Sequence, residues 1–439
     1  MTKKAFKVIL ILERVIGMQL IECIKKEDFD RFVCNHPYKS HFMQSYAWGE
    51  VMKKKNFLPH YVGLKKNDKL IATALLLEKK LIGNYSYFYC PRGFVWDYND
   101  EQVLKEMTKE LKKYAKKQKA IFIKIDPDIK RHDLDIDGHI INPENNHYSL
   151  IQNLESLGYK NKGFNTFFVN EQPRFTFRLD LKKDWDSIIR NMHPTTRKIY
   201  NKKNPFHLKL YIGQEKDLKD FYETMEETAK RENIRCNPIE YYRHFYQILH
   251  KENMSDLYVV KVNIHELEEF YQKKINQLEL QINSIDQSKY KNKQKLENKI
   301  KELENEKNKA IKELEKIKQI EQDELTLSSI MTVKYGNKVW TIHGGNHSLL
   351  RELNANYLLY FQIMEDAHKQ GYELIDFFGT SGIANPDKND PIYGIHLFKK
   401  RLGGEYTEFI GEYDLIIHPF LYFGYQKLIP IYRKLRKKL

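Results

Sequence analysis

A run of heptads in the middle of the chain limits its possible folds more than any other feature of the sequence. Apolar side chains recur at alternating steps of four and three residues from Tyr271 to Ile285, and largely so again from Leu296 to Ile317. This spacing is typical of helices that bury one narrow face against a partner helix. The polar segment DQSKYKNKQK separates the two runs. We therefore expect two helices joined by a polar turn.

These two helices can pair in two ways. They can fold back as an antiparallel hairpin, with arms of about 30 Å at 1.5 Å per residue, or they can join two copies of the chain as a coiled coil. Segments with strand character, DLYVVKVN and LSSIMTVKYG, lie on either side of the heptads. Because strands resume as though a loop had been lengthened, we favour an inserted hairpin over residues 263–325.

The rest of the sequence mixes strand and helix patterns. The segment YVGLKKNDKLIATALLLEK has two apolar runs around Asn67 and Asp68, which is the pattern of a β-hairpin. A lysine-rich helical pattern over 101–120 precedes IFIKIDPD, a short buried strand, and ANYLLYFQIMEDAHKQG precedes the strand ELIDFFG. A chain of 439 residues exceeds one ordinary core. We predict an α/β protein with two similar halves, although the sequence shows no internal repeat.

The charge of the chain indicates polyanionic partners. The formal net charge is +15, which favours nucleic acid, phosphorylated substrates or an anionic membrane surface without choosing among them. The four cysteines show no CxxC spacing, so we expect neither a zinc site nor a disulfide framework, and a cytoplasmic location fits best. The apolar run near the start is too short for a membrane span, and Glu13 and Arg14 interrupt it before a signal-peptide core can form.

Familiar catalytic motifs are missing from the sequence, but several polar groups remain as candidates. No P-loop, GxSxG elbow, HExxH or dinucleotide-binding glycine pattern occurs. Arg92 and Asp97 flank an aromatic cluster in PRGFVWDYND, where they can hold a ligand or form a structural salt link. Arg197 lies in HPTTRKIYNKK, a phosphate site or a solvated helix face. His343 and His347 are expected to be structural.

The last candidate is a lysine pair, Lys399 and Lys400, which follows Phe398 and precedes a Gly-Gly turn. A plain helix face is the alternative for these two lysines. This segment, NPDKNDPIYGIHLFKKRLGG, follows DFFG, and it occurs together with QSYAWGEV, CPRGFVWDY, IKIDPD and GEYDLIIHP. In this combination the chain resembles, from Met18 onward, the FemABX family of tRNA-dependent aminoacyltransferases, which build interpeptide branches in peptidoglycan. It is most similar to the lipid II:glycine glycyltransferase branch, and the serine and alanine adders are the near alternative.

The resemblance implies a fold and a set of domains. The fold is two tandem GNAT-like acyltransferase domains of the α/β (α+β) class, with an antiparallel coiled-coil arm inserted in the second. We expect the first domain at residues 18–180 and the second at 181–262 and 326–420. Residues 1–17 are then a start-site extension. Residues 421–439 form a basic tail that can lie on an anionic bilayer or pack as an ordinary helix.

The resemblance also implies a reaction, which is aminolysis of an aminoacyl-tRNA ester by the ε-amino group of the third stem-peptide residue. The donor is expected to be glycyl-tRNA, the acceptor lipid II or its soluble precursor UDP-MurNAc-pentapeptide, and no cofactor or metal is needed. Contact with the membrane surface and with other bridge-forming transferases would fit this role.

The family's Phe-Lys pair falls on Phe398 and Lys399, with Lys399 as the cation near the tRNA terminus and the developing oxyanion. Asp97 matches an acid near the acceptor amine, which it can orient or deprotonate. The further substrate-binding positions are Arg92, Arg197, Tyr241, Tyr242 and Tyr393.

Two functions of a different kind remain alternatives for this sequence. A non-catalytic RNA-binding protein would use the arm and the basic patches. A small-molecule N-acetyltransferase would need a coenzyme A site, but the sequence has no QxxGxG/A pyrophosphate loop.

Overall fold

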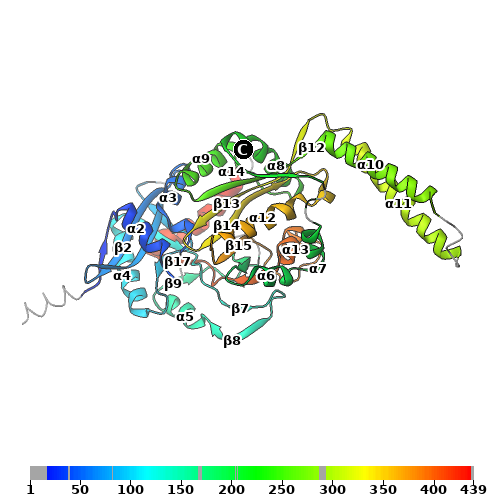
Figure 1. Ribbon diagram of the computed structural model, residues 1–439. Coiled ribbons are helices and arrows are strands. Elements are labelled where there is room, and N and C mark those ends of the chain that lie inside the picture. Colours follow the sequence, from blue (N-terminus) through cyan, green and yellow to red (C-terminus); the bar gives the residue numbers. More distant parts are fainter. Residues whose placement is uncertain are drawn as a thin grey trace, which may run out of the picture.

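Two mixed sheets lie side by side, and a long helical hairpin projects from one of them (Figure 1). The computed structural model describes residues 17–37, 40–81, 83–166, 171–202, 204, 206–285 and 293–436. The predicted extension, residues 1–17, therefore lies outside the described residues except for Gly17.

The first half of the chain supplies most of the first sheet and the helices that cover it. Its strands are β1 (Gln19–Ile21), β2 (Leu58–Lys66), β3 (Lys69–Lys80), β4 (Ser86–Cys90), β5 (Val95–Trp96), β6 (Ala120–Ile125) and β9 (Tyr159–Asn161), with β7 (His132–Leu134) and β8 (Ile140–Asn146) as a separate ribbon. Its helices are α2 (Lys26–Cys34), α3 (Tyr46–Lys53), α4 (Glu101–Lys117) and α5 (Tyr148–Ser156), with the 3₁₀ turn η1 (Phe42–Gln44).

The second half supplies most of the second sheet. Its strands are β11 (Lys209–Gly213), β12 (Ser255–Asn263), β13 (Glu324–Tyr335), β14 (Lys338–Asn346), β15 (Leu374–Gly379), β16 (Glu405–Glu408) and β17 (Tyr413–Ile416). Strand β10 (Phe175–Asp180), which ends the first half, joins the same sheet. Its helices are α6 (Trp185–Asn191), α7 (Pro194–Asn201), α8 (Leu218–Arg231), α9 (Ile239–Lys251), α10 (Ile264–Asn283), α11 (Lys293–Ile317), α12 (Ala355–Lys369), α13 (Tyr393–Arg401) and α14 (Pro419–Arg436), with the 3₁₀ turns η2 (Glu215–Asp217) and η4 (Arg351–Leu353).

Local sequence explains several of these boundaries. The β2–β3 hairpin turns at Asn67 and Asp68, which both adopt left-handed backbone angles (φ 48° and 61°), the geometry that such a two-residue turn requires. Asp100 is the N-cap of helix α4, and its carboxylate accepts a hydrogen bond from the Val103 amide. The helix ends with Lys116 and Lys117. The hairpin and the lysine-rich helix expected from the sequence are thus both present.

The two sheets repeat one strand order. The first runs β1-β2-β3-β4-β6-β17-β9, with β5 attached to β3, and the second runs β11-β12-β13-β14-β15-β10-β16. In each sheet one neighbouring pair is parallel, β4 with β6 and β14 with β15, and each pair is joined across a helix, α4 or α12. The expectation of two similar halves is confirmed at the level of topology, and the α/β class with it.

Each sheet borrows one strand from the other half of the chain. Strand β10 follows the first-half strand β9 but pairs with β15 and β16 of the second sheet. Strand β17 follows β16 but pairs with β6 and β9 of the first sheet. The two halves therefore exchange their equivalent strands: β10 precedes the expected boundary at residue 180 but lies in the second sheet, and β17 lies within the expected second domain but belongs to the first sheet. The domain bounds themselves stay predictions.

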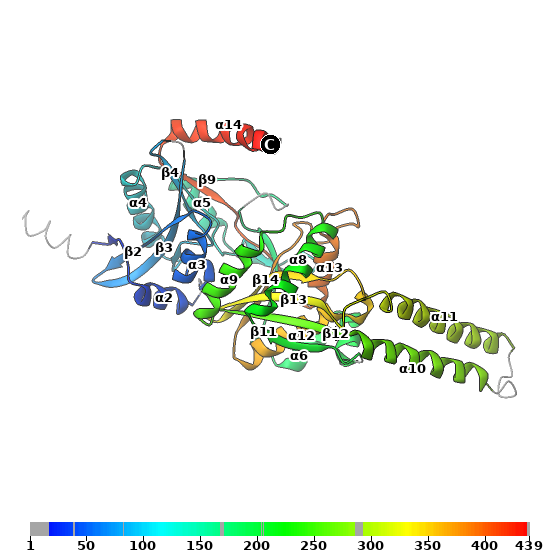
Figure 2. The same cartoon turned by 90° about the horizontal axis from the view of Figure 1, so that it is seen from above.

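The heptads form an antiparallel hairpin within one chain (Figures 1 and 2). The seam near the body is buried at Tyr271, Ile275, Leu278, Ala310 and Leu314. Ion pairs join the two arms between Lys274 and Glu306 (3.0 Å) and between Glu279 and Lys307 (3.4 Å). The hairpin lies between β12 and β13, the position that the Asn67–Asp68 turn occupies in the first sheet. It is therefore an enlarged β-turn, as the flanking strands predict.

Candidate active site

Lys399 lies where helix α13 faces the end of strand β15. Its ammonium group donates hydrogen bonds to the carbonyl oxygens of Phe378 (3.1 Å) and Gly379 (2.7 Å). The surrounding protein displaces water from this group, and the loss of hydration lowers its pKa to about 8, although the negative charge of Asp376 opposes the shift. Lys399 is thus a cation at neutral pH that releases its proton near pH 8.

The end of β15 has an unusual backbone. Phe378 adopts φ 61°, a left-handed conformation that is rare for an aromatic residue and costs about 1–2 kcal/mol. Its amide donates to a carboxylate oxygen of Asp376 (2.8 Å), and its carbonyl accepts from the hydroxyl of Thr176 (3.0 Å) as well as from Lys399. The strained turn is therefore held from several sides, and it aims two carbonyls at one lysine.

A cavity of about 500 Å³ opens beside Lys399. Phe398, also from α13, lines it and packs against the rings of Tyr357 and Tyr360, each with a centroid distance of 4.9 Å. The remaining wall comes from α8, β13, β14, β15 and α12, with Thr228, Ile330, Thr341, Gly344, Asn356 and Gly379 among its residues. This space can hold a small acyl group close to the lysine.

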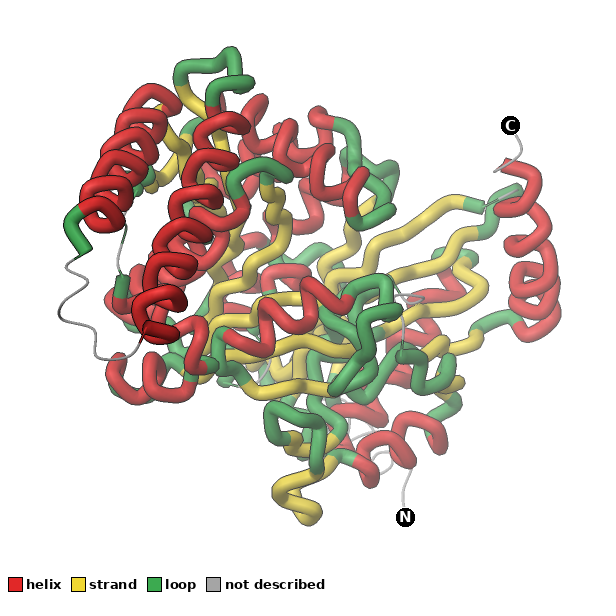
Figure 3. Tube along the Cα trace, turned by 90° about the vertical axis from the view of Figure 1, so that its right-hand side faces the viewer, coloured by secondary structure: helices red, strands yellow, loops and turns green. Residues whose placement is uncertain are grey.

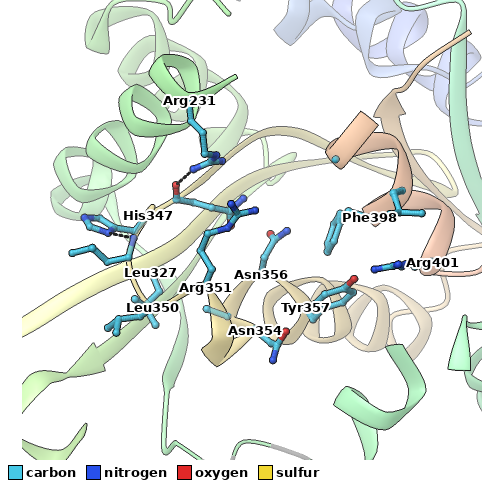
Figure 4. Close-up of a pocket in the computed structure, with 15 residues that line it drawn as sticks. Arg231, Leu327, His347, Leu350, Arg351, Asn354, Asn356, Tyr357, Phe398 and Arg401 are labelled. Atoms are coloured by element: carbon cyan, nitrogen blue, oxygen red, sulfur yellow. Dashed lines mark hydrogen bonds between the residues drawn. The ribbon is translucent and has the colours of Figure 1, made fainter. Parts of the chain in front are cut away.

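A second hollow of about 240 Å³ adjoins the first and shares Arg231, Asn346, Arg351, Asn356 and Phe398 with it (Figure 4). Arg231 of α8, Arg351 of η4 and Arg401 of α13 line it from three separate elements, and its wall includes no Asp or Glu. Arg231 donates to the Asn346 carbonyl (3.1 Å). Figure 4 shows the three guanidinium groups around one space.

Only part of the charge in this hollow is neutralised by protein, because among the described residues Arg231 pairs with Glu232 (2.8 Å) but the other two arginines do not. Within the described part of the chain, neither Arg351 nor Arg401 forms an ion pair, and the Nε atom of Arg401 is buried without an acceptor. Helix α12 begins at the same wall with Asn354 as its N-cap, and that side chain makes no capping hydrogen bond. A helix N-terminus adds partial positive charge. The hollow is therefore suited to an anion.

A buried network ties this region to the first half of the chain. Arg178 of β10 bonds to Asp128, which follows β6, and to Asp376 of β15 (2.9 Å). Lys338 of β14 lies 3.6 Å from Asp128. Because Asp376 in turn holds the Phe378 amide, the path runs from the IDPD segment through Arg178 to the carbonyl that Lys399 contacts. Breaking a buried pair of this kind typically costs about 3–5 kcal/mol.

The site residues expected from the sequence are not all brought together. Lys399 and Phe398 meet at the cavity, while Tyr393 begins the same helix but is not among the residues that line either hollow. Asp97 is exposed in the turn after β5, where its carboxylate accepts from the Asn99 amide (3.1 Å). Nothing in the described structure links Asp97 to Lys399.

The two expected arginines have partners inside the protein. Arg92 is buried, donates to the Pro173 carbonyl (2.7 Å) and lies over the ring of Phe409, so it joins the two halves. Arg197 donates to the Arg190 carbonyl (2.6 Å) on α6. Neither residue is among those that line the two hollows, so their substrate roles stay predictions.

Tyr241 and Tyr242 lie on α9 around His343. The Tyr241 hydroxyl is 3.3 Å from His343 Nε2, its ring lies under the Lys55 ammonium, and Tyr242 is almost fully buried. Burial lowers the pKa of His343 to about 3, helped by the charge of Lys55, so the imidazole is neutral. This supports a structural role for His343. The Nε2 atom of His347 lies 2.8 Å from a carboxylate oxygen of Glu227 at the second hollow.

Sequence reasoning missed the arginine set of the second hollow. Arg231, Arg351 and Arg401 are far apart in the chain, and none belongs to a recognisable motif. Arg351 offered one signal, since it stands just before the helical segment ANYLLYFQIMEDAHKQG, where anions bind readily.

Comparison with known proteins fits this architecture. A profile of the FemAB family matches residues 24–429, nearly the whole described chain. The chain belongs to the FemAB family. Relatives include the lipid II:glycine glycyltransferases of Staphylococcus haemolyticus (strain JCSC1435), 27% identical over 95% of this chain and 97% of the relative, and of Staphylococcus aureus (strain bovine RF122 / ET3-1), 28% identical over 94% and 99%.

A solved structure resembles this FemAB-family chain over most of its length. The crystal structure of FemX superimposes with a TM-score of 0.72 and 26% identity, and the match covers 92% of this chain and 98% of that one. The family expected from the sequence motifs is confirmed, and so is the expected fold class, including the inserted helical arm.

Proposed function

We propose that this chain transfers an aminoacyl group, most simply glycine, from aminoacyl-tRNA to the stem-peptide lysine of lipid II. The names of its relatives support the acceptor and the glycyl group, because lipid II:glycine glycyltransferases align with it from end to end. The site described above supports a donor that carries an activated ester and a polyanionic body. Serine or alanine in place of glycine is the near alternative, and so is a soluble UDP-linked acceptor.

The reaction is an aminolysis. The neutral acceptor amine attacks the ester carbonyl carbon, a C–N bond forms, and the C–O bond to the tRNA ribose breaks. The proton lost by the amine ends on the ribose oxygen that leaves. Negative charge develops on the carbonyl oxygen in between, and a fixed cation nearby lowers the barrier. No cofactor enters this balance.

Lys399 is the observation that carries the proposal. It is a desolvated cation at the edge of a cavity that can hold the acyl group, and two backbone carbonyls of a strained turn fix its position. A cation in a site of low polarity interacts with developing charge far more strongly than one in water. We therefore assign oxyanion stabilisation to Lys399 and the adjoining aromatic wall to Phe398.

The arginine hollow supports aminoacyl-tRNA as the donor. Three guanidinium groups, of which Arg351 and Arg401 form no ion pair within the described residues, are suited to phosphodiester oxygens, which Arg binds in a bidentate way. The hollow adjoins the Lys399 cavity, so an ester at Lys399 would place the last phosphates of its RNA near Arg231, Arg351 and Arg401. The net charge of +15 favours capture of both polyanionic substrates.

A lipid-linked acceptor would place the protein at the inner face of the plasma membrane. None of the helices in the described ranges combines the length and apolar character needed to cross a bilayer. We therefore propose peripheral contact, and other bridge-forming transferases are candidate neighbours there.

Transfer of labelled glycine from glycyl-tRNA to purified lipid II tests the proposal. We expect Lys399→Met to lower kcat by about 10² or more, as loss of an oxyanion donor usually does, with lipid II binding nearly unchanged. The matched control is Lys400→Met, because Lys400 is the next residue of α13 but bonds to Asp137 and Asn385, away from the Lys399 carbonyls.

Arg351→Ala provides a separate readout, because this substitution should raise the KM for aminoacyl-tRNA and leave the KM for lipid II unchanged. Unaltered turnover in Lys399→Met would remove that residue from the mechanism. Binding of tRNA without any transfer would favour an RNA-binding protein instead. Faster transfer of serine or alanine than of glycine would favour the near alternative.

A further inference from the structure

Helix α14 presents large apolar side chains to solvent on the outside of the molecule. Figures 2 and 3 both place it at the periphery, away from the arm. The side chains of Phe420 and Phe423 are 87% and 59% exposed, and that of Leu428 is 65% exposed. Single exposed apolar residues are ordinary, but three within nine residues of one helix form a patch.

This patch is fixed in place by the opposite side of the same helix. The Tyr422 hydroxyl donates to the carboxylate of Asp414 (2.8 Å) and accepts from Lys162 (3.2 Å). The rings of Tyr422 and Tyr425 pack on Phe122 at centroid distances of 5.4 and 5.2 Å. Since α14 is attached to the first sheet through Tyr422 and Tyr425, its other side is held outward.

The helical spacing places the exposed aromatics together. Phe420, Phe423 and Lys427 are separated by three and four residues, so they share one face, opposite Tyr422 and Tyr425. The Lys427 ammonium lies 4.4 Å from the centre of the Phe423 ring. An exposed aromatic face with a lysine beside it is the composition of a surface that enters the headgroup region of a membrane.

The sequence of this segment carries only positively charged side chains among its ionisable Lys, Arg, Asp and Glu positions. From residue 419 to residue 439 it contains no Asp or Glu, and its basic residues are Lys427, Arg433, Lys434, Arg436, Lys437 and Lys438. A cluster of this size is drawn to anionic lipid, whereas a protein partner with an apolar groove would not need it. The charge and the aromatic content of this segment therefore both indicate that an anionic lipid surface covers the exposed face of α14.

We propose that the outward face of α14, formed by Phe420, Phe423, Lys427 and Leu428, docks on the surface of an anionic lipid bilayer. The aromatic side chains enter the interface while Lys427 meets lipid headgroups, and the helix lies along the membrane without crossing it. The biological use of this surface rests on the proposed function, because a lipid-linked acceptor is then reached by a protein already on its membrane. The binding itself does not require transfer activity.

Vesicle binding by the full chain tests the inference. We expect co-sedimentation with vesicles that contain phosphatidylglycerol, little with pure phosphatidylcholine, and release at high salt. The double variant Phe420→Ser, Phe423→Ser should weaken binding to anionic vesicles at least tenfold. Phe420→Trp, Phe423→Trp should retain it, because tryptophan also favours the membrane interface. Leu280→Ser is the matched control, since Leu280 is 68% exposed on the arm helix α10.

Several outcomes would overturn the inference. One is a full chain that ignores anionic vesicles, and another is a double variant that binds them as tightly as the unchanged chain. If the unchanged chain forms a dimer and binds no vesicles, and the double variant is a monomer, the face would be assigned to contact with a second copy of the chain. The double variant should still transfer glycine to acceptor dispersed in detergent. If neither the unchanged chain nor the double variant transfers glycine under any condition, the proposed function is contradicted, but the vesicle-binding result is unaffected.

Discussion

At the scale of single residues, the role proposed for Lys399 makes the reaction rate depend on pH. The acceptor amine must lose a proton to attack, so the rate should rise with pH on the acidic side. Lys399 must keep its proton to act as a cation, and since its pKa is about 8, the rate should fall as the pH rises through that value. A profile of kcat from pH 6 to 10 should therefore be bell-shaped, with Lys399 responsible for the basic limb.

The substitution Lys399→Arg tests whether Lys399 or another group causes the basic limb of the pH profile. Arginine stays protonated throughout that range, so the basic limb should move to higher pH even where the maximal rate is lower. A basic limb that stays at the same pH in Lys399→Arg would mean that another group titrates there.

The lowered pKa of Lys399 also affects the stability of the fold. In the unfolded chain the lysine keeps its proton up to about pH 10.5, whereas in the folded chain it loses the proton near pH 8. The buried charge therefore disfavours folding at neutral pH, and this effect fades between pH 8 and 10.5.

Sequence patterns located some of these residues and missed others for a physical reason. Phe398 and Lys399 could be expected to lie together, because neighbours in a short motif remain neighbours on one helix, and their roles in the reaction stay predictions. Arg231, Arg351 and Arg401 meet through tertiary packing of α8, η4 and α13, which no local pattern records. The left-handed Phe378 was equally hidden, because nothing in the sequence DFFG requires φ 61° at that phenylalanine.

At the scale of elements, the arm follows from its sequence most directly. Heptad spacing is a local property, so the seam from Tyr271 to Leu314 could be predicted residue by residue, and flanking strands favoured an insertion over a dimer. The exchange of β10 and β17 could not be predicted, because each strand has the same pattern in either sheet and pairing partners lie far away in the chain.

Shortening the arm tests whether it takes part in RNA binding. Replacing residues 279–299 with a short Gly-Ser turn removes the distal part but keeps the buried seam at Tyr271, Ile275, Leu278, Ala310 and Leu314. If the arm contacts the body of the tRNA, we expect a higher KM for aminoacyl-tRNA and an unchanged KM for lipid II in steady-state assays. An unaffected tRNA KM would assign the arm another role. Retention of the unfolding temperature serves as the control for folding.

At the scale of the whole molecule, the exchanged strands make the two halves depend on each other. Strand β17 lies between β6 and β9, so its removal leaves a gap inside the first sheet, and β10 has the same place in the second. We expect a single thermal unfolding transition, measured by circular dichroism, in place of one for each half. Two separate transitions would contradict this coupling.

Two truncated chains test whether the first sheet depends on β17. A chain that ends after Gly411 lacks β17 and should fail to fold, whereas a chain that ends after His418 keeps every strand and loses only α14 and the segment beyond it. We expect the longer chain to retain a cooperative transition at a lower temperature, since Phe122 loses the cover of Tyr422 and Tyr425. Equal stability of both truncations would show that β17 is dispensable.

The place of β17 also bears on how the protein is made. A ribosome that has released β9 must still synthesise the chain from residue 161 to residue 413 before the first sheet can close. At about 5–20 residues per second this wait lasts on the order of ten seconds or more, with the edges of β6 and β9 open to unwanted pairing. Nascent chains of this protein are therefore expected to be clients of chaperones that shield open strand edges during translation.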